Sequence, residues 1–386
     1  MLVQAKLDFK DVQILEAIGK HGPRNLAEVS RKLEIPEGTL RSRLRHLASH
    51  FFVRFNLNIY HTNLGLKKAM VFAEVTPGYE NLVLDCLKAN GFWIYMTRCY
   101  GKYEGCVSVY TIPKGHESEF KRFIKEIENL GVIRTTRIFW STCFQTVNPT
   151  SQWFDGQSNT WVFQWDKWID EIINEETHLP RTLRDPEDFV LNADYTDIFI
   201  LKELEKNART SFVEIAKKLN MDRRTIEYHY RNHVLKRGLI EGFKVTTFHF
   251  DLRISDWIYF ILKFQSKDKL AKFARSLLDK SFASTIGKVL GENMLVTLLY
   301  LPRSEFRKFI DCLATLVKKD FLLDYEYTFL DLKEYAQQTL SYEFFKDKSW
   351  SYSHKENMKK LHEITGLRPQ MRERNERVVS EEVTVC

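Results

Sequence analysis

Apolar residues recur at helical spacing along residues 25–47, in two short runs separated by a proline. Asn25 and Glu28 stand where the two members of a helix-capping box would stand. Pro36 lacks a backbone N–H and therefore ends the first helix. The inward-facing positions are Leu26, Val29, Leu33, Leu40, Leu44 and Leu47. This pattern predicts a helix-turn-helix, whose second helix begins at about Glu37 and presents an outer face to a DNA major groove.

A second segment, residues 211–233, aligns with the first one without a gap at a constant offset of 186 residues. Ser211 takes the capping position of Asn25, and Glu214 takes that of Glu28. The apolar positions of the first helix are matched by Phe212, Ile215 and Leu219. Agreement in caps, core positions and turn together favours an internal duplication.

The flanking pattern has the same order in both halves of the chain. A helix capped by Asp8, with Asp11 at its third position, precedes the first helix-turn-helix, and a strand-like segment over Phe51–Tyr60 follows it as a wing. Residues 68–144 then alternate as strand, helix, strand, strand, helix and strand, and residues 257–330 repeat this order. The order βαββαβ is that of a ferredoxin-like unit.

An aromatic stretch, residues 153–168, separates the two halves and holds four of the eight tryptophans. A similar but weaker pattern follows the second half. Its residues Trp350, Tyr352, Met358 and Leu361 match earlier apolar positions at a constant offset. Aromatic clusters can stack on single-stranded bases. Packing against the neighbouring sheet is the favoured interpretation, because Tyr and Trp mostly bury area.

The expected fold class is α+β, with two winged helix-turn-helix domains alternating with two ferredoxin-like βαββαβ domains. The expected boundaries are 1–65 and 192–254 for the winged helix-turn-helix domains, 66–147 and 255–332 for the ferredoxin-like domains, 148–191 for an aromatic appendage and linker, 333–366 for a second, aromatic and helical appendage, and 367–386 for a disordered tail.

Composition is compatible with a polyanionic partner. The 386 residues carry a net charge of +7, an excess that suits nucleic acid but does not by itself require it. The six cysteines form no CxxC pair, so neither a zinc ribbon nor a disulfide framework is expected. No apolar run approaches membrane-spanning length, and no signal sequence is recognisable at the N-terminus. We therefore expect a soluble, cytoplasmic protein.

The candidate DNA-contacting residues lie on the outer faces of the second helices and on the first wing. Arginine suits guanine edges and phosphates, although arginine on an exposed helix is often only solvated. The candidates are Arg41, Ser42, Arg43, Arg45, Arg54, Arg223, Arg224, Tyr228 and Arg231. His229 and His233 have a spacing that suits a metal, but no third ligand is evident nearby in the sequence, so no metal and no cofactor are expected.

These elements together resemble the leucine-responsive regulator family, also called the Lrp/AsnC or feast/famine family. The resemblance covers about residues 6–145 and 192–331 and includes the turn Tyr100-Gly101-Lys102-Tyr103-Glu104. Two features depart from the family: both copies lie on one chain, and the aromatic appendages are additional. The resemblance implies a transcriptional regulator that binds double-stranded DNA, with its two ferredoxin-like units paired within one chain as an intramolecular pseudo-dimer.

The resemblance also implies an effector, commonly an amino acid held between paired ferredoxin-like units. The glycine turns are the candidate positions, although plain hairpin turns would have the same sequence. The candidate effector-binding residues are Gly101, Lys102, Glu104, Gly291, Glu292 and Asn293.

Two alternatives remain open at this stage. Sirohaem decarboxylases resemble the same family and pair two homologous units, and here Arg98 and His116 would be the candidates for a tetrapyrrole pocket. No phosphate loop or nucleophile motif is present, so an enzyme is not the favoured interpretation. The second alternative is an architectural or RNA-binding protein with little sequence preference.

Overall fold

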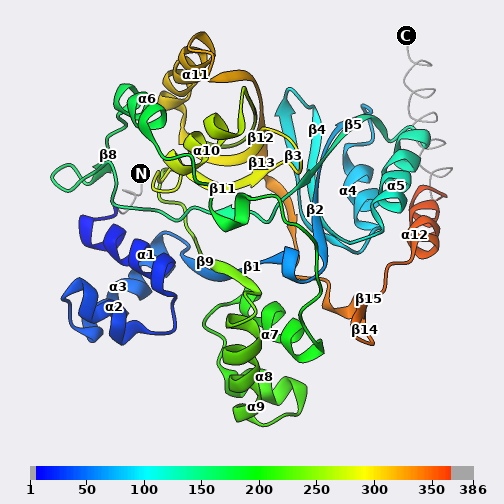
Figure 1. Ribbon diagram of the computed structural model, residues 1–386, viewed down its shortest axis with the longest axis horizontal. Helices are drawn as coiled ribbons and strands as arrows, with labels where there is room; N and C mark the ends of the chain where they lie inside the picture. Colours follow the sequence, from blue (N-terminus) through cyan, green and yellow to red (C-terminus); the bar gives the residue numbers. More distant parts are fainter. Residues whose placement is uncertain (1–5, 367–386) are drawn as a thin grey trace, which may run out of the picture.

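The computed structural model describes residues 6–366 and begins with a three-helix unit (Figure 1). Asp8 and Asp11 cap the first helix reciprocally, and the Asn25 side chain accepts a hydrogen bond from Glu28 N. Glu34 ends the second helix in the left-handed region, with φ of 53°. The helices are α1 (Phe9–His21), α2 (Leu26–Leu33) and α3 (Glu37–His50). The predicted caps and the predicted apolar face are confirmed.

A second three-helix unit has the same order, and its first two helices are capped at the corresponding positions. Asp194 and Asp197 form its capping box, and Ser211 accepts from Glu214 N. Its helices are α7 (Tyr195–Lys206), α8 (Phe212–Leu219) and α9 (Arg223–Tyr228). Unlike α3, α9 is short and continues directly into a π-helix, η3 (His229–Leu235). Apolar periodicity does not predict this change of helix type.

The segments expected as wings each contribute one strand, and these strands pair with each other. They are β1 (Arg54–Ile59) and β9 (Ile240–Thr246), which run antiparallel with Arg54 opposite Thr246. Each unit therefore closes with a strand whose partner comes from the other unit, and the resulting ribbon lies between the two sets of helices (Figure 1). Local hydrophobic alternation predicts a strand but does not specify its partner.

Two βαββαβ units form the larger part of the molecule. The first contains β2 (Leu66–Val75), α4 (Glu80–Lys88), β3 (Trp93–Gly101), β4 (Gly105–Pro113), α5 (Glu117–Asn129) and β5 (Ile133–Ser141). The second contains β10 (Ser255–Phe264), α10 (Lys267–Ser276), β11 (Ala283–Lys288), β12 (Met294–Pro302), α11 (Arg303–Lys318) and β13 (Leu322–Gln337).

The strands of both units join in one sheet, in the order β5-β2-β4-β3-β13-β10-β12-β11-β6, where β6 is Gln145–Thr146. β3 pairs antiparallel with β13 at the centre. On the opposite side, Leu290 N donates to Trp140 O at 2.8 Å, so the two halves of the sheet also meet there. An apolar core fills the space between them, and Phe72 lies 5.9 Å from Tyr259 between ring centroids.

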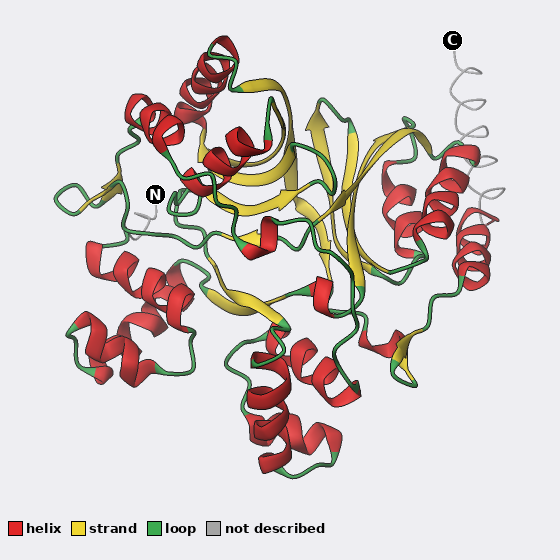
Figure 2. Cartoon of the chain, in the orientation of Figure 1, coloured by secondary structure: helices red, strands yellow, loops and turns green. Residues whose placement is uncertain are grey.

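Helices cover the outer faces of both halves (Figure 2), and the two appendages cross over to reach them. The hairpin of β7 (Phe154–Asp155) and β8 (Thr160–Trp161) leads into α6 (Trp165–Asn174), which packs on α10 and α11 of the second unit. The hairpin of β14 (Phe345–Lys346) and β15 (Ser349–Trp350) leads into α12 (His354–Gly366), which packs on α4 and α5 of the first. The short 3-10 helices are η1 (His61–Asn63), η2 (Arg181–Leu183) and η4 (Tyr342–Phe344).

The aromatic appendages therefore serve packing. Trp168 is fully buried among Phe273, Phe282 and Phe309, and its indole N–H donates to Ser276 O at 3.3 Å. A side chain in this position is not accessible to a nucleotide base.

Among residues 6–366, no helix combines the length and the apolar character needed to cross a bilayer. The five cysteines in that range are buried, and none of them forms a disulfide. The tail expected over residues 367–386 lies outside the described part of the chain.

Candidate nucleic-acid interface

The outer face of α3 carries three of the predicted DNA-contacting side chains. Arg41, Ser42 and Arg45 are exposed there. The Arg41 guanidinium donates to Glu37 Oε1 one turn earlier, from Nε at 3.0 Å. This i,i+4 pair is exposed, so it holds the guanidinium only weakly and leaves it available to a phosphate.

Arg43 differs from these three residues, because its guanidinium is paired with two carboxylates of the first helix. Its Nη1 donates to Asp8 Oδ2 and to Asp11 Oδ1, both at 2.7 Å. These hydrogen bonds raise the pKa of the Arg43 guanidinium. Asp11 is buried, so Arg43 supplies the charge that compensates a buried carboxylate between α1 and α3.

We call α3, and α9 together with its continuation η3, the two reading helices. The second of them exposes its own set of polar side chains. Arg223, Arg224, Tyr228 and Arg231 are all exposed, and Arg231 extends from the π-helical segment. Arg223 Nη2 lies 2.7 Å from Glu227 Oε1, which repeats the i,i+4 pairing of Arg41 with Glu37. Asp222 caps α9 by accepting from Arg224 N.

The two helix-turn-helix units share a cleft of about 490 Å³. Its walls include the first turns of α2 and α8, so two helix N-termini, with their partial positive charge, border it. Four arginines and one acid, Glu37, line it: the arginines are Arg24, Arg41, Arg209 and Arg223. The cleft is therefore strongly basic, and one predicted residue from each reading helix lies in its wall.

Arg24 fastens the two units together across this cleft. Its Nε donates to Ala208 O at 2.9 Å, and its Nη2 donates to Thr210 O. The guanidinium carbon also lies 4.2 Å from the centre of the Phe212 ring. Burial lowers the pKa of the Arg24 guanidinium. Sequence analysis missed Arg24 and Arg209. The only available signal was that each lies one or two residues before a helix cap, where no periodicity marks it.

Arg54 is exposed at the end of the β1–β9 ribbon, three residues beyond Phe51, which follows α3.

A second cavity, of about 420 Å³, lies between the two halves of the large sheet. Its charged lining residues are Arg137, Lys263, Glu292, Asp324 and Glu326. Of the predicted effector residues, only Glu292 lines it. Gly101 instead pairs with Thr328 in the β3–β13 ladder, with Lys102 and Glu104 in the following turn, and Gly291 and Asn293 form the turn beside Glu292.

A polar network closes one wall of this cavity. Arg137 Nη1 donates to Tyr103 Oη at 2.6 Å, and Tyr103 Oη donates to Glu326 Oε2 at 3.0 Å. Burial raises the pKa of Tyr103 to about 12, so it remains a hydrogen-bond donor at neutral pH. The network joins the first unit to the second.

The residues considered for tetrapyrrole chemistry are not brought together. Arg98 Nη1 pairs with Glu334 Oε2 at 3.0 Å on β3. His116 stacks on Tyr352 and contacts Glu119 at the start of α5. Neither residue lines either of the two cavities described above.

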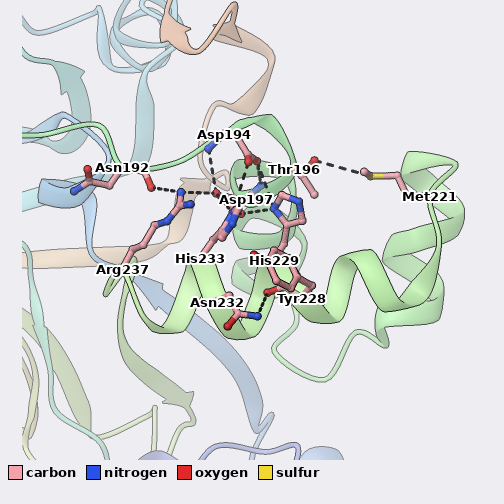
Figure 3. Close-up of polar contacts among 10 residues, drawn as sticks. All are labelled: Asn192, Asp194, Thr196, Asp197, Met221, Tyr228, His229, Asn232, His233 and Arg237. Atoms are coloured by element: carbon pink, nitrogen blue, oxygen red, sulfur yellow. Dashed lines mark hydrogen bonds and ion pairs between the residues drawn. The ribbon is translucent and has the colours of Figure 1, made fainter.

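His229 and His233 do meet carboxylates, contrary to what the sequence suggested. Asp194 and Asp197, at the start of α7, lie beside both imidazoles (Figure 3). The missing partners were more than 30 residues away in the chain, where ligand spacing gives no signal.

Comparison with known proteins bears on the second unit directly. Residues 194–232 match the family model described as winged helix-turn-helix DNA-binding. The chain contains a winged helix-turn-helix. It is 29% identical over 98 residues to an uncharacterized HTH-type transcriptional regulator of Pyrococcus furiosus, a match that covers 25% of this chain and 60% of that protein. It is 24% identical over 136 residues to the HTH-type transcriptional regulator Ptr1 of Methanocaldococcus jannaschii, covering 34% of this chain and 82% of the relative.

Solved structures give fold likenesses at low identity. The siroheme decarboxylase NirDL aligns over 93% of this chain and 99% of its own, with 13% identity and a TM-score of 0.49. LrpC of B. subtilis aligns over 35% of this chain and 93% of its own, with 18% identity and a TM-score of 0.29. The family model and the two relatives show that the chain is similar to HTH-type transcriptional regulators.

Proposed function

We propose that this chain is a DNA-binding transcriptional regulator that contacts one duplex with both of its helix-turn-helix units. The observation that carries the proposal is the basic cleft between the units. It combines four guanidinium groups with two helix N-termini, and both features favour a phosphate backbone. The first turn of α3 and the first turn of α9 border the same cleft, so the two reading helices approach a duplex from one side.

The reading helices differ in sequence, and this supports an asymmetric target. The first reading helix, α3, exposes Arg41, Ser42 and Arg45, whereas α9 and η3 expose Arg223, Arg224, Tyr228 and Arg231. Base-edge contacts from unlike side chains specify unlike bases. A duplicated chain therefore has no need of a palindromic site, whereas identical subunits would read one.

The recurrent order of elements supports descent from a duplicated and fused ancestral module. The capping boxes Asp8/Asp11 and Asp194/Asp197 recur at the offset of 186 residues found in the sequence. The domain boundaries given above are part of this proposal, as is the paired arrangement of the two βαββαβ units as an intramolecular pseudo-dimer.

We also propose that the cavity between the sheet halves accepts a small effector. Its volume of about 420 Å³ falls in the range of small-molecule pockets. Its lining presents both cationic and anionic groups, which matches a zwitterion such as an amino acid. A regulator of this kind is favoured over an enzyme, because Arg98 and His116 are not brought into a shared pocket.

The decisive experiment is selection of bound duplexes from a random pool by the full chain at defined salt. The expected result is an asymmetric consensus with two unlike halves. The double variant Arg41→Ala with Arg45→Ala should relax preference in one half only, by about 1–3 kcal/mol for each lost base contact. Equal affinity for random and selected duplexes would instead favour an architectural role. A palindromic consensus would contradict the proposal that two unlike helices contact the bases.

A further inference from the structure

Four side chains capable of binding metal converge where the second helix-turn-helix unit begins. Asp194 and Asp197 come from the start of α7, and His229 and His233 come from η3 (Figure 3). One ligand atom from each residue lies within 4.8 Å of all the others. The cluster contains two imidazoles and two carboxylates, and Asp197 is completely buried.

Four ligand–ligand distances in the cluster are close to the spacing of ligands around a tetrahedral zinc ion. His229 Nδ1 and His233 Nδ1 lie 2.8 and 3.1 Å from Asp197 Oδ1. The same nitrogens lie 3.6 Å from the two oxygens of Asp194. Zinc–ligand bonds of about 2.0–2.1 Å place neighbouring tetrahedral ligands about 3.3 Å apart. The four contacts, from 2.8 to 3.6 Å, lie on either side of that value.

In the first unit, an arginine side chain occupies the corresponding place. Asp8 and Asp11 correspond to Asp194 and Asp197 at the offset of 186 residues, and Arg43 corresponds to His229. The Arg43 guanidinium bridges Asp8 and Asp11. In the second unit a histidine stands in place of that bridging arginine, and Arg237 is a fixed cation that remains beside the carboxylates, at 3.5 Å from Asp197 Oδ2.

The π-helix supplies the second histidine. At the same offset His233 corresponds to Leu47, which is fully buried in the core of the first unit. In the second unit the buried position moves on by one residue to Val234. A π-helical turn accommodates one extra residue, and such turns are frequent at functional sites. Here the shift brings His233 out of the core and turns its Nδ1 toward Asp197.

Arg237 completes the surroundings of the cluster without occupying it. Its Nη1 lies 3.5 Å from Asp197 Oδ2 and donates to Asn192 O at 3.0 Å. Asp197 Oδ2 also accepts from Asp194 N at 3.1 Å and lies 3.2 Å from His233 Nδ1, so both carboxylate oxygens are held in place beside the histidines.

We propose that Asp194, Asp197, His229 and His233 bind one divalent transition-metal ion of the zinc class, which fastens η3 to the start of α7. Nitrogen and carboxylate ligands in a tetrahedral arrangement suit zinc or cobalt, and calcium and magnesium prefer all-oxygen sites.

The test is titration of the full chain, first stripped with chelator, with Co²⁺ followed by visible absorption and with Zn²⁺ followed by calorimetry. The wild type should bind one equivalent of either ion, with a Co²⁺ spectrum of tetrahedral type, and Mg²⁺ should not compete. His229→Arg recreates the arrangement of the first unit, so it should stay folded while it loses the bound equivalent. His233→Gln should weaken binding by at least about 10-fold, since it removes one of four ligands.

The matched control is His46→Ala with His50→Ala. These residues form an i,i+4 histidine pair on α3 with ring centroids 4.2 Å apart, and among residues 6–366 they belong to no cluster of three or more metal-binding side chains. The double variant should bind as the wild type does. The proposal is overturned if the wild type takes up no stoichiometric ion, if the His229→Arg chain binds as well as the wild type, or if the control pair accounts for the binding.

Discussion

At the residue scale, arginines two positions apart on α3 have different roles. Arg41 and Arg45 are exposed, whereas Arg43 compensates the buried carboxylate of Asp11. The apolar spacing of the helix predicts which positions turn inward, because that information is local. It does not distinguish Arg43 from its neighbours, because its partners lie 32 and 35 residues away on another helix.

Arg43→Ala should therefore destabilise the protein without entering the DNA surface. It leaves Asp11, whose side chain is 6% exposed, without its cation, so we expect a loss of about 1–3 kcal/mol in the free energy of unfolding. Urea denaturation measures this loss. Arg45→Ala, a change of the same type on the exposed face, should alter the free energy of unfolding by less than about 0.5 kcal/mol. Similar losses in the two variants would contradict the assignment of Arg43 to the α1–α3 contact.

At the element scale, the sequence predicts most helices and strands, whereas their partners come from the three-dimensional structure. The βαββαβ order and both capping boxes follow from local pattern. The pairing of β1 with β9 and the crossing of α6 and α12 to the other unit do not, because they join segments more than 90 residues apart. For the same reason, sequence analysis identified His229 and His233 but not the aspartates beside them.

Trp168→Ala tests the contribution of the α6 crossing. The indole is fully buried against α10 and α11, so its removal should cost about 3–5 kcal/mol in the free energy of unfolding. The control is Val162→Ala beside the same hairpin, where the side chain is 48% exposed and the change should be under about 0.5 kcal/mol. Chemical denaturation of both variants compares the two costs. A small effect of Trp168→Ala would mean that α6 is only loosely attached.

A pH-dependent contact joins α7 to the segment before η4. Glu205 Oε2 accepts from Leu340 N at 2.6 Å, and burial raises the pKa of this carboxyl to about 7. A raised pKa means that the folded state holds the proton more tightly than the unfolded state. The contribution of protonated Glu205 to the free energy of unfolding is therefore fully present below the usual carboxyl range and is lost as pH rises through about 7.

We predict that the wild type loses about 1–3 kcal/mol more than Glu205→Gln between about pH 5 and about pH 8. Urea denaturation at the two pH values measures the difference, because groups that titrate in both proteins cancel. Glu343→Gln, a change at an exposed carboxylate nearby, should retain the pH dependence of the wild type. Identical pH profiles for wild type and Glu205→Gln would show that burial does not perturb this carboxyl.

At the scale of the whole molecule, one chain holds two reading units in fixed relation to each other. Arg24 holds the first unit to the loop before α8. The strands that follow the two reading helices, β1 and β9, pair with each other and so join the two units. Around them, the continuous sheet and the crossed appendages bind the two halves of the chain together. The basic cleft is a product of this arrangement, since neither unit alone contributes all of its walls.

The most direct test of DNA binding across this cleft is the salt dependence of binding to a selected duplex, measured by fluorescence anisotropy for the wild type and for Arg41→Ala with Arg223→Ala. Each arginine that neutralises a phosphate contributes about one to the slope of log affinity against log salt, so the double variant should lower the slope by about 2. Lys125→Ala with Lys359→Ala removes the same charge from exposed positions on α5 and α12 and should leave the slope unchanged. If both double variants behave alike, or if neither differs from the wild type, duplex DNA does not cross the cleft between the two units.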